Sequence, residues 1–258
     1  MDNAPTTSGD AREVKIPVWR RMATFPLVAL FLGLLAFGIM SAFLAFLAYG
    51  FASVMGIERI QDMPDWFSSY LRPILATVGS ILVLKLAIRH FVAEKRDDLP
   101  FDGRSRDFLT GIAFAAILMS LVVGIAAVLG GYRVSGWGGS TSLGWLLLAA
   151  GFKAAFFEEI LFRGVIFRFL EEFAGSWIAL ILSAILFGFL HHNNPNATLF
   201  TTLAIAIQAG VLLGGAYMLT RNLWFAIGLH WGWNVTQGYI WDVSVSGIPV
   251  DGMLEAHP

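Results

Sequence analysis

The sequence predicts an all-α membrane protein, a polytopic transmembrane bundle of about seven helices, with eight possible. Of its 258 residues, 57% are hydrophobic and 14% are charged. Soluble domains average about 45–50% apolar and about 25% charged residues, so this composition is typical of a membrane protein. In addition, apolar runs of about the 20 residues that a membrane helix needs recur along the chain.

Short polar turns separate the seven expected helices. The first apolar run is about twice as long as the core of a signal peptide, so we expect it to be a retained membrane helix. The loops are too short to contain a second, soluble fold. The expected helices cover residues 25–55, 71–92, 108–131, 143–167, 177–192, 197–219 and 223–240.

Lysine and arginine are unevenly distributed between the two sets of loops. One set of segments lies before the first expected helix and after the second, fourth and sixth expected helices. Its cations are Arg12, Lys15, Arg20, Arg21, Lys95, Arg96, Arg104, Arg106, Arg168 and Arg221. The opposite loops contain Arg59, Arg72 and Arg133. Because cytoplasmic loops carry the excess of these residues, we expect a cytoplasmic N-terminus and an outer C-terminus. The expected location is the plasma (inner) membrane.

Two compositional features exclude whole classes of function. The chain has no cysteine, which excludes disulfides, thiolate metal sites and cysteine nucleophiles. Its net charge of -1 provides no general attraction to nucleic acid. We therefore expect the lipid bilayer as a partner and no nucleic acid.

Two adjacent carboxylates and an arginine interrupt the fourth apolar run. A charge at membrane depth costs a few kcal/mol, so such residues usually face the protein interior and have a function there. Glu159 and Arg163 are four residues apart and share one helix face, in the favourable order for an ion pair. Glu158 lies about 100° round the helix and has no obvious local partner. We interpret Glu159 and Arg163 as a structural pair and Glu158 as the reactive group.

Two later apolar helices also carry polar groups. His191 follows Phe187 by four residues near the end of the fifth helix, and His230 and Asn234 share one face of the seventh. Taken singly, the three groups have structural alternatives: a buried ion pair, an interfacial histidine and an interhelical hydrogen-bond pair. Their joint appearance favours one shared site, provided that the fourth, fifth and seventh helices pack together.

These groups suit hydrolysis. A carboxylate assisted by an imidazole can deprotonate a water, and a second imidazole and an amide can stabilise an oxyanion. Alternatively, Glu158, His191 and His230 would bind a zinc ion that activates its water. The His-Glu-x-x-His helix of common zinc proteases is absent from the sequence. The expected cofactor is therefore either none or a zinc ion.

The three motifs resemble those of a known membrane family. They read Glu158-Glu159-x-x-x-Arg163, Phe187-x-x-x-His191 and His230-x-x-x-Asn234. In this order, on separate apolar helices, they are similar to the motifs of the CPBP family, the CAAX-protease and bacteriocin-processing proteins. This family, also called Abi, includes type II CAAX prenyl endopeptidases. The resemblance covers about residues 143–240.

The resemblance implies an intramembrane endopeptidase with a buried catalytic cavity. By motif position Glu158 would activate the water with the help of His191, and His230 and Asn234 would support the oxyanion. The supporting residues would be Glu159, Arg163 and Phe187. Family members are labelled metalloproteases, while a metal-independent glutamate mechanism has also been argued for them. We favour the glutamate-activated water.

We therefore expect hydrolysis of a peptide bond in a membrane-associated protein or peptide. The alternatives are a non-proteolytic transport, immunity or scaffold protein that uses the same polar cavity, and a proton or ion transporter. The expected segments are a cytoplasmic tail (1–24), N-terminal transmembrane helices and loops (25–142), a catalytic transmembrane core (143–241) and a C-terminal tail (242–258).

Overall fold

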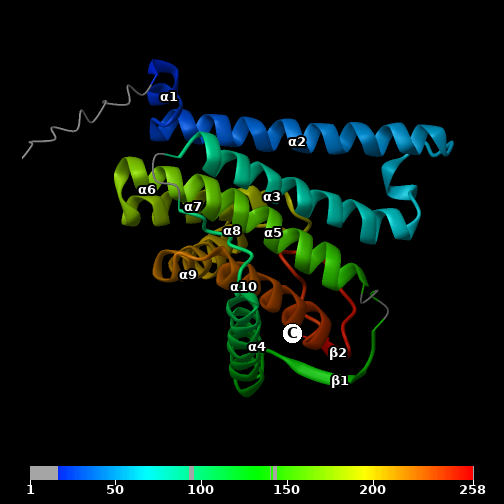
Figure 1. Ribbon diagram of the computed structural model, residues 1–258. Helices are drawn as coiled ribbons and strands as arrows, with labels where there is room; N and C mark the ends of the chain where they lie inside the picture. Colours follow the sequence, from blue (N-terminus) through cyan, green and yellow to red (C-terminus); the bar gives the residue numbers. More distant parts are fainter. Residues whose placement is uncertain (1–16, 93–95, 140, 142–143, 258) are drawn as a thin grey trace, which may run out of the picture.

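The computed structural model describes residues 17–92, 96–139, 141 and 144–257. Most of the expected N-terminal tail, residues 1–16, and the cation Lys95 lie outside the described residues. Within the described part the chain forms a helical bundle with one small sheet (Figure 1). The predicted all-α membrane bundle is confirmed, whereas the boundaries of the four expected segments stay a prediction.

The first half of the bundle consists of a short helix and three long ones. Pro26 occupies the first turn of the longest helix, where its missing N–H removes no hydrogen bond. A π-helical turn, Trp66–Leu71, leads directly into the next long helix. The helices are α1 (Val18–Ala23), α2 (Pro26–Val54), α3 (Arg72–His90) and α4 (Ser105–Val128).

The second half contains the helices that carry the three motifs. Residues 145–174 form one continuous run, in which π-helical turns lie on both sides of α5 (Ala154–Glu159). Such turns are frequent at functional sites. The helices that follow are α6 (Arg168–Ala174), α7 (Ser176–Leu190), α8 (Leu199–Ile205), α9 (Leu212–Thr220) and α10 (Leu223–Val235). A π-helical turn joins α8 to α9, and another extends α10 to residue 240.

Local sequence signals explain where several of these helices begin. The Thr198 side chain accepts a hydrogen bond from the backbone N–H of Thr201, forming a capping box at the start of α8. The side chain of Asn222 accepts from the Trp224 N–H at the start of α10. Between α6 and α7, Gly175 has a φ of +86°, a conformation that favours glycine.

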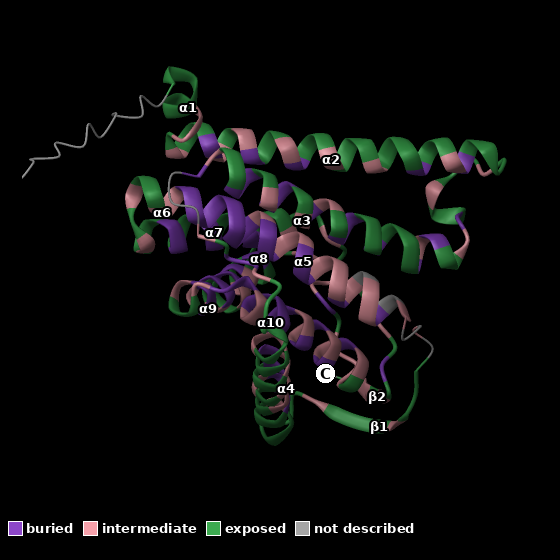
Figure 2. Ribbon diagram, in the orientation of Figure 1, coloured by how far each residue is buried: buried purple, intermediate pink, exposed green. Residues whose placement is uncertain are grey.

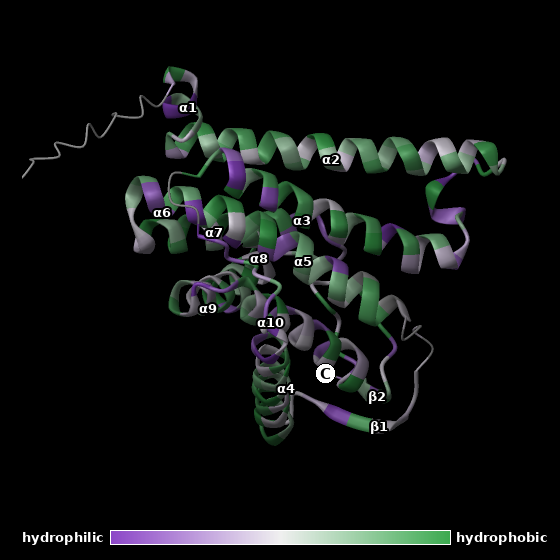
Figure 3. Cartoon of the chain, in the orientation of Figure 1, coloured by the Kyte–Doolittle hydropathy of each residue, from purple (hydrophilic) through white to green (hydrophobic). Residues whose placement is uncertain are grey.

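Outer and inner helices differ in burial and hydropathy. Among the described residues, five helical runs are long and apolar enough to cross a membrane: Pro26–Val54, Trp66–His90, Ser105–Val128, Ser176–Asn193 and Leu199–Thr220. Figures 2 and 3 show that α2 and α4 are both largely exposed and hydrophobic, as lipid contact requires. With 29 residues, α2 is about 44 Å long, which exceeds a hydrocarbon core of about 30 Å and requires tilting or extension past it.

Glycines allow α10 to pack very closely against α4. A Cβ atom on Gly228 would lie 2.1 Å from the carbonyl oxygen of Phe108, and one on Gly111 would lie 2.4 Å from that of Phe225. Small residues commonly allow such close approach between membrane helices. This contact fixes the position of α10, which carries the third motif.

The small sheet is a feature that sequence analysis treated as loop and tail. Strand β1 (Arg133–Trp137) pairs antiparallel with β2 (Leu254–His257), so this last strand lies beside β1 (Figure 1). The Asp242 carboxylate accepts hydrogen bonds from the N–H groups of Gly252 and Ala256, at 2.6 and 3.0 Å. A two-stranded ribbon is marginal by itself, so these tertiary contacts support it.

Candidate active site

A cavity of about 1000 Å³ opens inside the bundle, and we call it the chamber. It lies between the C-terminal half of α2, the start of α3, the run 145–174, the end of α7 and the last turns of α10. Its lining residues with carboxylate, cationic, imidazole or amide side chains are Asp65, Arg72, Lys153, Glu158, His191, Asn194, His230 and Asn234. The four residues predicted to be catalytic therefore line one chamber, although they come from three separate helical runs.

Glu158 lies between the two histidines of the chamber. Its Oε2 atom is 3.8 Å from His191 Nε2 and 3.9 Å from His230 Nε2. Both distances exceed a direct hydrogen bond but suit a bridging water. The same oxygen is buried and has no hydrogen-bond partner among the described residues. Glu158 therefore presents a carboxylate oxygen that can accept a proton from a bound water.

The backbone of α7 orients His191. Its Nδ1 is 2.7 Å from the carbonyl oxygen of Phe187, four residues earlier. Since a carbonyl oxygen only accepts, Nδ1 must donate, and the neutral ring then has its lone pair on Nε2. That nitrogen is the one nearer Glu158. The spacing of the second motif thus sets both the tautomer and the direction of His191.

A buried carboxylate orients His230. His230 Nδ1 is 2.9 Å from Glu159 Oε1, and Arg163 Nη1 donates to the same oxygen at 2.8 Å. Glu159 and Arg163 are both fully buried, and Arg163 also donates to the carbonyl oxygen of Gly210 at 3.0 Å. The expected Glu159–Arg163 pair is present. Sequence reasoning missed the additional bond to His230, because no local spacing links residues 71 positions apart.

Asn234 is held against the start of the first motif helix. Its Nδ2 donates to the carbonyl oxygen of Ala150 at 2.8 Å. A carbonyl partner requires the amide nitrogen on that side, which settles the orientation of the side chain. Because an amide nitrogen carries two hydrogens, one N–H of Asn234 stays available to a further acceptor.

Phe187 packs at the centre of the motif residues. Its ring lies 4.8 Å from the ring of His191 and 6.1 Å from that of His230, between ring centroids. The Arg163 guanidinium lies 4.8 Å over the same ring, in cation–π geometry. Phe187 is buried, and its ring packs against the Arg163 guanidinium and both imidazoles.

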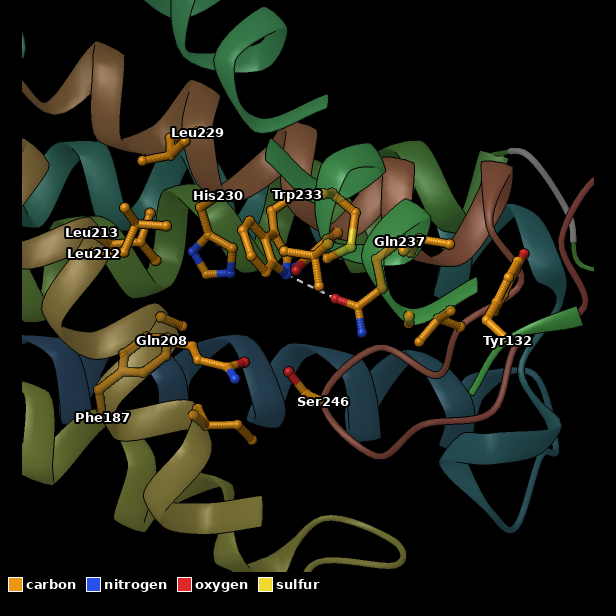
Figure 4. A pocket seen from close by; sticks show the side chains of 18 of the residues that line it. Tyr132, Phe187, Gln208, Leu212, Leu213, Leu229, His230, Trp233, Gln237 and Ser246 are labelled. Carbon is orange, nitrogen blue, oxygen red and sulfur yellow. Dashed lines mark hydrogen bonds between the residues drawn. The ribbon is translucent and has the colours of Figure 1, made fainter. Parts of the chain in front are cut away.

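A second cavity of about 370 Å³ adjoins the chamber, and we call it the apolar pocket. It shares His230, Asn234 and Ser246 with the chamber. Figure 4 shows His230 and Trp233 on one side of it and Phe187 and Gln208 on the other. The apolar members of its lining include Met119, Val123, Leu212, Leu213 and Leu229. Sequence analysis did not find this pocket, because its lining comes from helices far apart in the chain.

The candidate zinc ligands do not form a metal site. Among the described residues, no group of three His, Cys, Asp or Glu side chains could hold a metal ion. Ligands of a tetrahedral zinc at about 2.0–2.2 Å lie about 3.3–3.6 Å from one another. The Glu158 oxygen is 3.8 and 3.9 Å from the two imidazole nitrogens. We therefore derive no step of the reaction through a metal.

Comparison with known proteins supports the interpretation of the motifs. Residues 140–236 match a family model described as "Type II CAAX prenyl endopeptidase Rce1-like". The matched range contains all three motifs. Searches of curated proteins and of solved structures found no match. The family match supports an intramembrane protease of the CAAX type in general. The resemblance to the CAAX-protease family is thereby confirmed over residues 140–236.

Proposed function

We propose that this protein is an intramembrane endopeptidase in which Glu158 activates a water for attack on a peptide carbonyl. One observation carries this proposal: a buried, unpartnered Glu158 oxygen lies within 4 Å of the Nε2 atoms of His191 and His230. A carboxylate and imidazoles around a space that a water can occupy are the elements of general base catalysis.

The reaction follows from the hydrogen-bonding capacity of these groups. The water binds between Glu158 and His191, donates one hydrogen bond to His191 Nε2 and keeps that hydrogen through the attack. Glu158 takes the second hydrogen of the water as a proton while the water oxygen bonds to the peptide carbon. The protonated Glu158 then gives its proton to the peptide nitrogen as the C–N bond breaks. The products are a carboxylic acid and an amine, with atoms and charge balanced.

His230 and Asn234 stabilise the oxyanion that forms during the attack. The free N–H of Asn234 is one donor, and His230 Nε2 is the other when the ring is an imidazolium. Glu159 accepts from Nδ1 and its negative charge compensates that of the ring. Donors aimed at the developing charge in a site shielded from water are strong contributors to catalysis. The apolar pocket begins at these two residues and suits an apolar side chain near the cleaved bond.

Cleavage by the purified protein tests this function. The protein in detergent is incubated with a library of apolar peptides and membrane-protein fragments, and products are identified by mass spectrometry. Glu158→Ala is expected to lower the cleavage rate by about 10²–10⁴-fold. Equal cleavage by both forms contradicts the role of Glu158. Absence of cleavage with retained peptide binding favours a non-proteolytic protein that uses the same cavity.

We further infer that the protein lies in the plasma membrane with its N-terminus in the cytoplasm, so that the chamber opens on the outer side. Ion pairs and hydrogen bonds join the cation-rich segments at one end of the bundle: Arg168–Asp98, Arg221–Glu171 and Asn222–Asp107. The chamber is lined by residues of the other end, including Tyr49, Asp65 and Asn194. Excess lysine and arginine on one side indicates the cytoplasmic face.

The absence of native cysteine makes this orientation easy to test. Glu58 and Asp102 are exposed and lie in loops at opposite ends of the bundle. A membrane-impermeant maleimide should label Glu58→Cys in intact cells, and Asp102→Cys only after lysis. The reverse pattern contradicts the proposed orientation and places the chamber on the cytoplasmic side.

A further inference from the structure

Two cations of the chamber have no hydrogen-bond or ion-pair partner among the described residues. Lys153 ends a π-helical turn of the first motif helix, Arg72 begins α3, and both line the chamber together with Glu158. Neither makes a hydrogen bond or an ion pair within the part of the chain that the structure describes. By contrast, Arg163 is paired with Glu159, and Lys85 with Asp97.

Arg72 and Lys153 lie close enough for their charges to interact. Arg72 repels the positive charge of Lys153, and Glu158 attracts it. Lys153 precedes Glu158 by five residues, which corresponds to about 7–8 Å along the helix axis. The remaining acid of the described lining, Asp65, accepts a hydrogen bond from Ser69 and forms no ion pair with either cation. Like charges that face one cavity are unfavourable, and a further anion bound between them would relieve the repulsion.

We propose that Lys153 and Arg72 form a carboxylate-binding subsite that selects the peptide cleaved at Glu158. This inference rests on the proposed peptidase function. The guanidinium of Arg72 can bind a carboxylate through two parallel N–H donors, and the ammonium of Lys153 adds a compact charge. A peptide without a carboxylate leaves both cations unpaired, so it binds less well. The carboxylate belongs either to the C-terminus of the peptide or to an aspartate or glutamate side chain.

A simpler role for Lys153 makes a different prediction. If Lys153 only balanced the charge of Glu158, its loss would affect the cleavage of acidic and neutral peptides equally. If Lys153 belongs to a subsite, its loss should raise the KM and weaken the binding of carboxylate-bearing peptides, and it should leave neutral peptides unaffected. Loss of Arg72 also distinguishes the two roles, because Arg72 lies on a different helix and is not needed to balance the charge of Glu158. Only a subsite predicts that its loss weakens the binding of carboxylate-bearing peptides.

Binding to a cleavage-deficient protein tests the subsite. Glu158→Gln protein is titrated with one fluorescent apolar peptide in three forms: with a C-terminal carboxylate, with a C-terminal amide, and as the amide with aspartate as its last residue. The protein should bind at least one carboxylate form about tenfold more tightly than the plain amide. Whichever carboxylate form binds more tightly identifies the source of the carboxylate.

Variants assign that preference to the two cations. Lys153→Met and Arg72→Met, each added to Glu158→Gln, should lose the preference, and Lys153→Arg should keep it. Arg89→Met is the matched control, because Arg89 is exposed near the opposite end of α3 and does not line the chamber. Circular dichroism and size-exclusion chromatography show whether each variant is folded. If Lys153→Met is not folded, Lys153→Gln takes its place.

The outcomes separate this inference from the proposed function. Equal binding of all three peptide forms, or an equal loss for all of them in Lys153→Met, overturns the subsite. Cleavage of the same peptides by the otherwise unaltered chain is measured in parallel. If that cleavage depends on Glu158 while the forms bind alike, the peptidase proposal stands and the subsite fails. If the carboxylate preference persists but Glu158→Ala cleaves normally, the catalytic proposal fails and the subsite stands.

Discussion

Charged residues at the two ends of the bundle are arranged in opposite ways. At the cation-rich end, Asp98 is fully buried and accepts hydrogen bonds from Arg96 at 2.6 Å, from the Tyr217 hydroxyl at 3.0 Å, and from Arg168. In the chamber, Glu158 Oε2 has no hydrogen-bond partner in the described chain, and Lys153 and Arg72 have none either. The same kinds of residue are therefore satisfied at one end and left available at the other.

This difference separates charges that hold the fold from charges suited to chemistry. Burial lowers the pKa of Arg96, but its hydrogen bond and ion pair with Asp98 raise that pKa more, so Arg96 stays charged throughout the usual pH range. Removing one member of such a cluster leaves a buried charge uncompensated. Groups that face a cavity without a hydrogen-bond partner contribute little to stability, and they are candidates for a functional site.

The largest expected effect is a loss of activity without a loss of stability. Glu158→Gln should lower kcat by about 10²–10⁴-fold, because the amide cannot accept the proton of the water. Its melting temperature should change little, since Glu158 Oε2 makes no direct hydrogen bond to the described residues. Peptide cleavage and thermal unfolding in detergent measure the two effects, with Glu58→Gln in an exposed loop as the control. A clear fall in melting temperature would show that Glu158 stabilises the fold, as the charges at the cation-rich end do.

Glu159→Gln should affect both activity and stability. Glu159 pairs with the fully buried Arg163, so its neutralisation should cost about 3–5 kcal/mol of unfolding free energy. It also accepts from His230 Nδ1, and partners that orient a functional histidine typically contribute about 10–100-fold in activity. The kcat of the folded fraction and its pH profile measure the second effect. An unchanged kcat and profile would restrict Glu159 to a structural role.

Asp98→Asn should lower stability and spare the chemistry. The substitution removes the negative charge beside Arg168, which is only 2% exposed, so we expect a cost of about 3 kcal/mol. Cleavage per folded molecule should change little, because Asp98 does not line the chamber. Thermal unfolding and active-site titration measure the two quantities. A variant with normal stability and lost cleavage would show that the two ends are coupled.

The smallest expected effect is that of metal removal. Because Glu158, His191 and His230 do not form a metal-binding group, dialysis against a zinc chelator should leave kcat/KM unchanged. Metal analysis of the purified, active protein accompanies the assay. Stoichiometric zinc that is lost together with activity, and activity restored by zinc, would replace the glutamate mechanism by a metal-assisted one.

Some features of this protein follow from the sequence alone. Apolar runs of membrane length must form helices, because an unpaired backbone group in lipid is costly, and this determines the fold class. The Glu159–Arg163 pair follows from a spacing of four residues on one helix. The spacing of Phe187 and His191 likewise allows the carbonyl bond that orients the imidazole. All of these relations are local, so periodicity is sufficient to predict them.

Other features were decided only by the packing of helices that are distant in sequence. The Glu159–His230 bond, the apolar pocket, the isolation of Lys153 and Arg72 and the β1–β2 pairing have no local signal. Each depends on the distance between elements, such as the close approach of α4 and α10 at Gly111 and Gly228. The sequence alone determined which residues can do chemistry in this membrane protein. Tertiary structure decided which of them have partners, because only packing brings distant charges within a few ångströms.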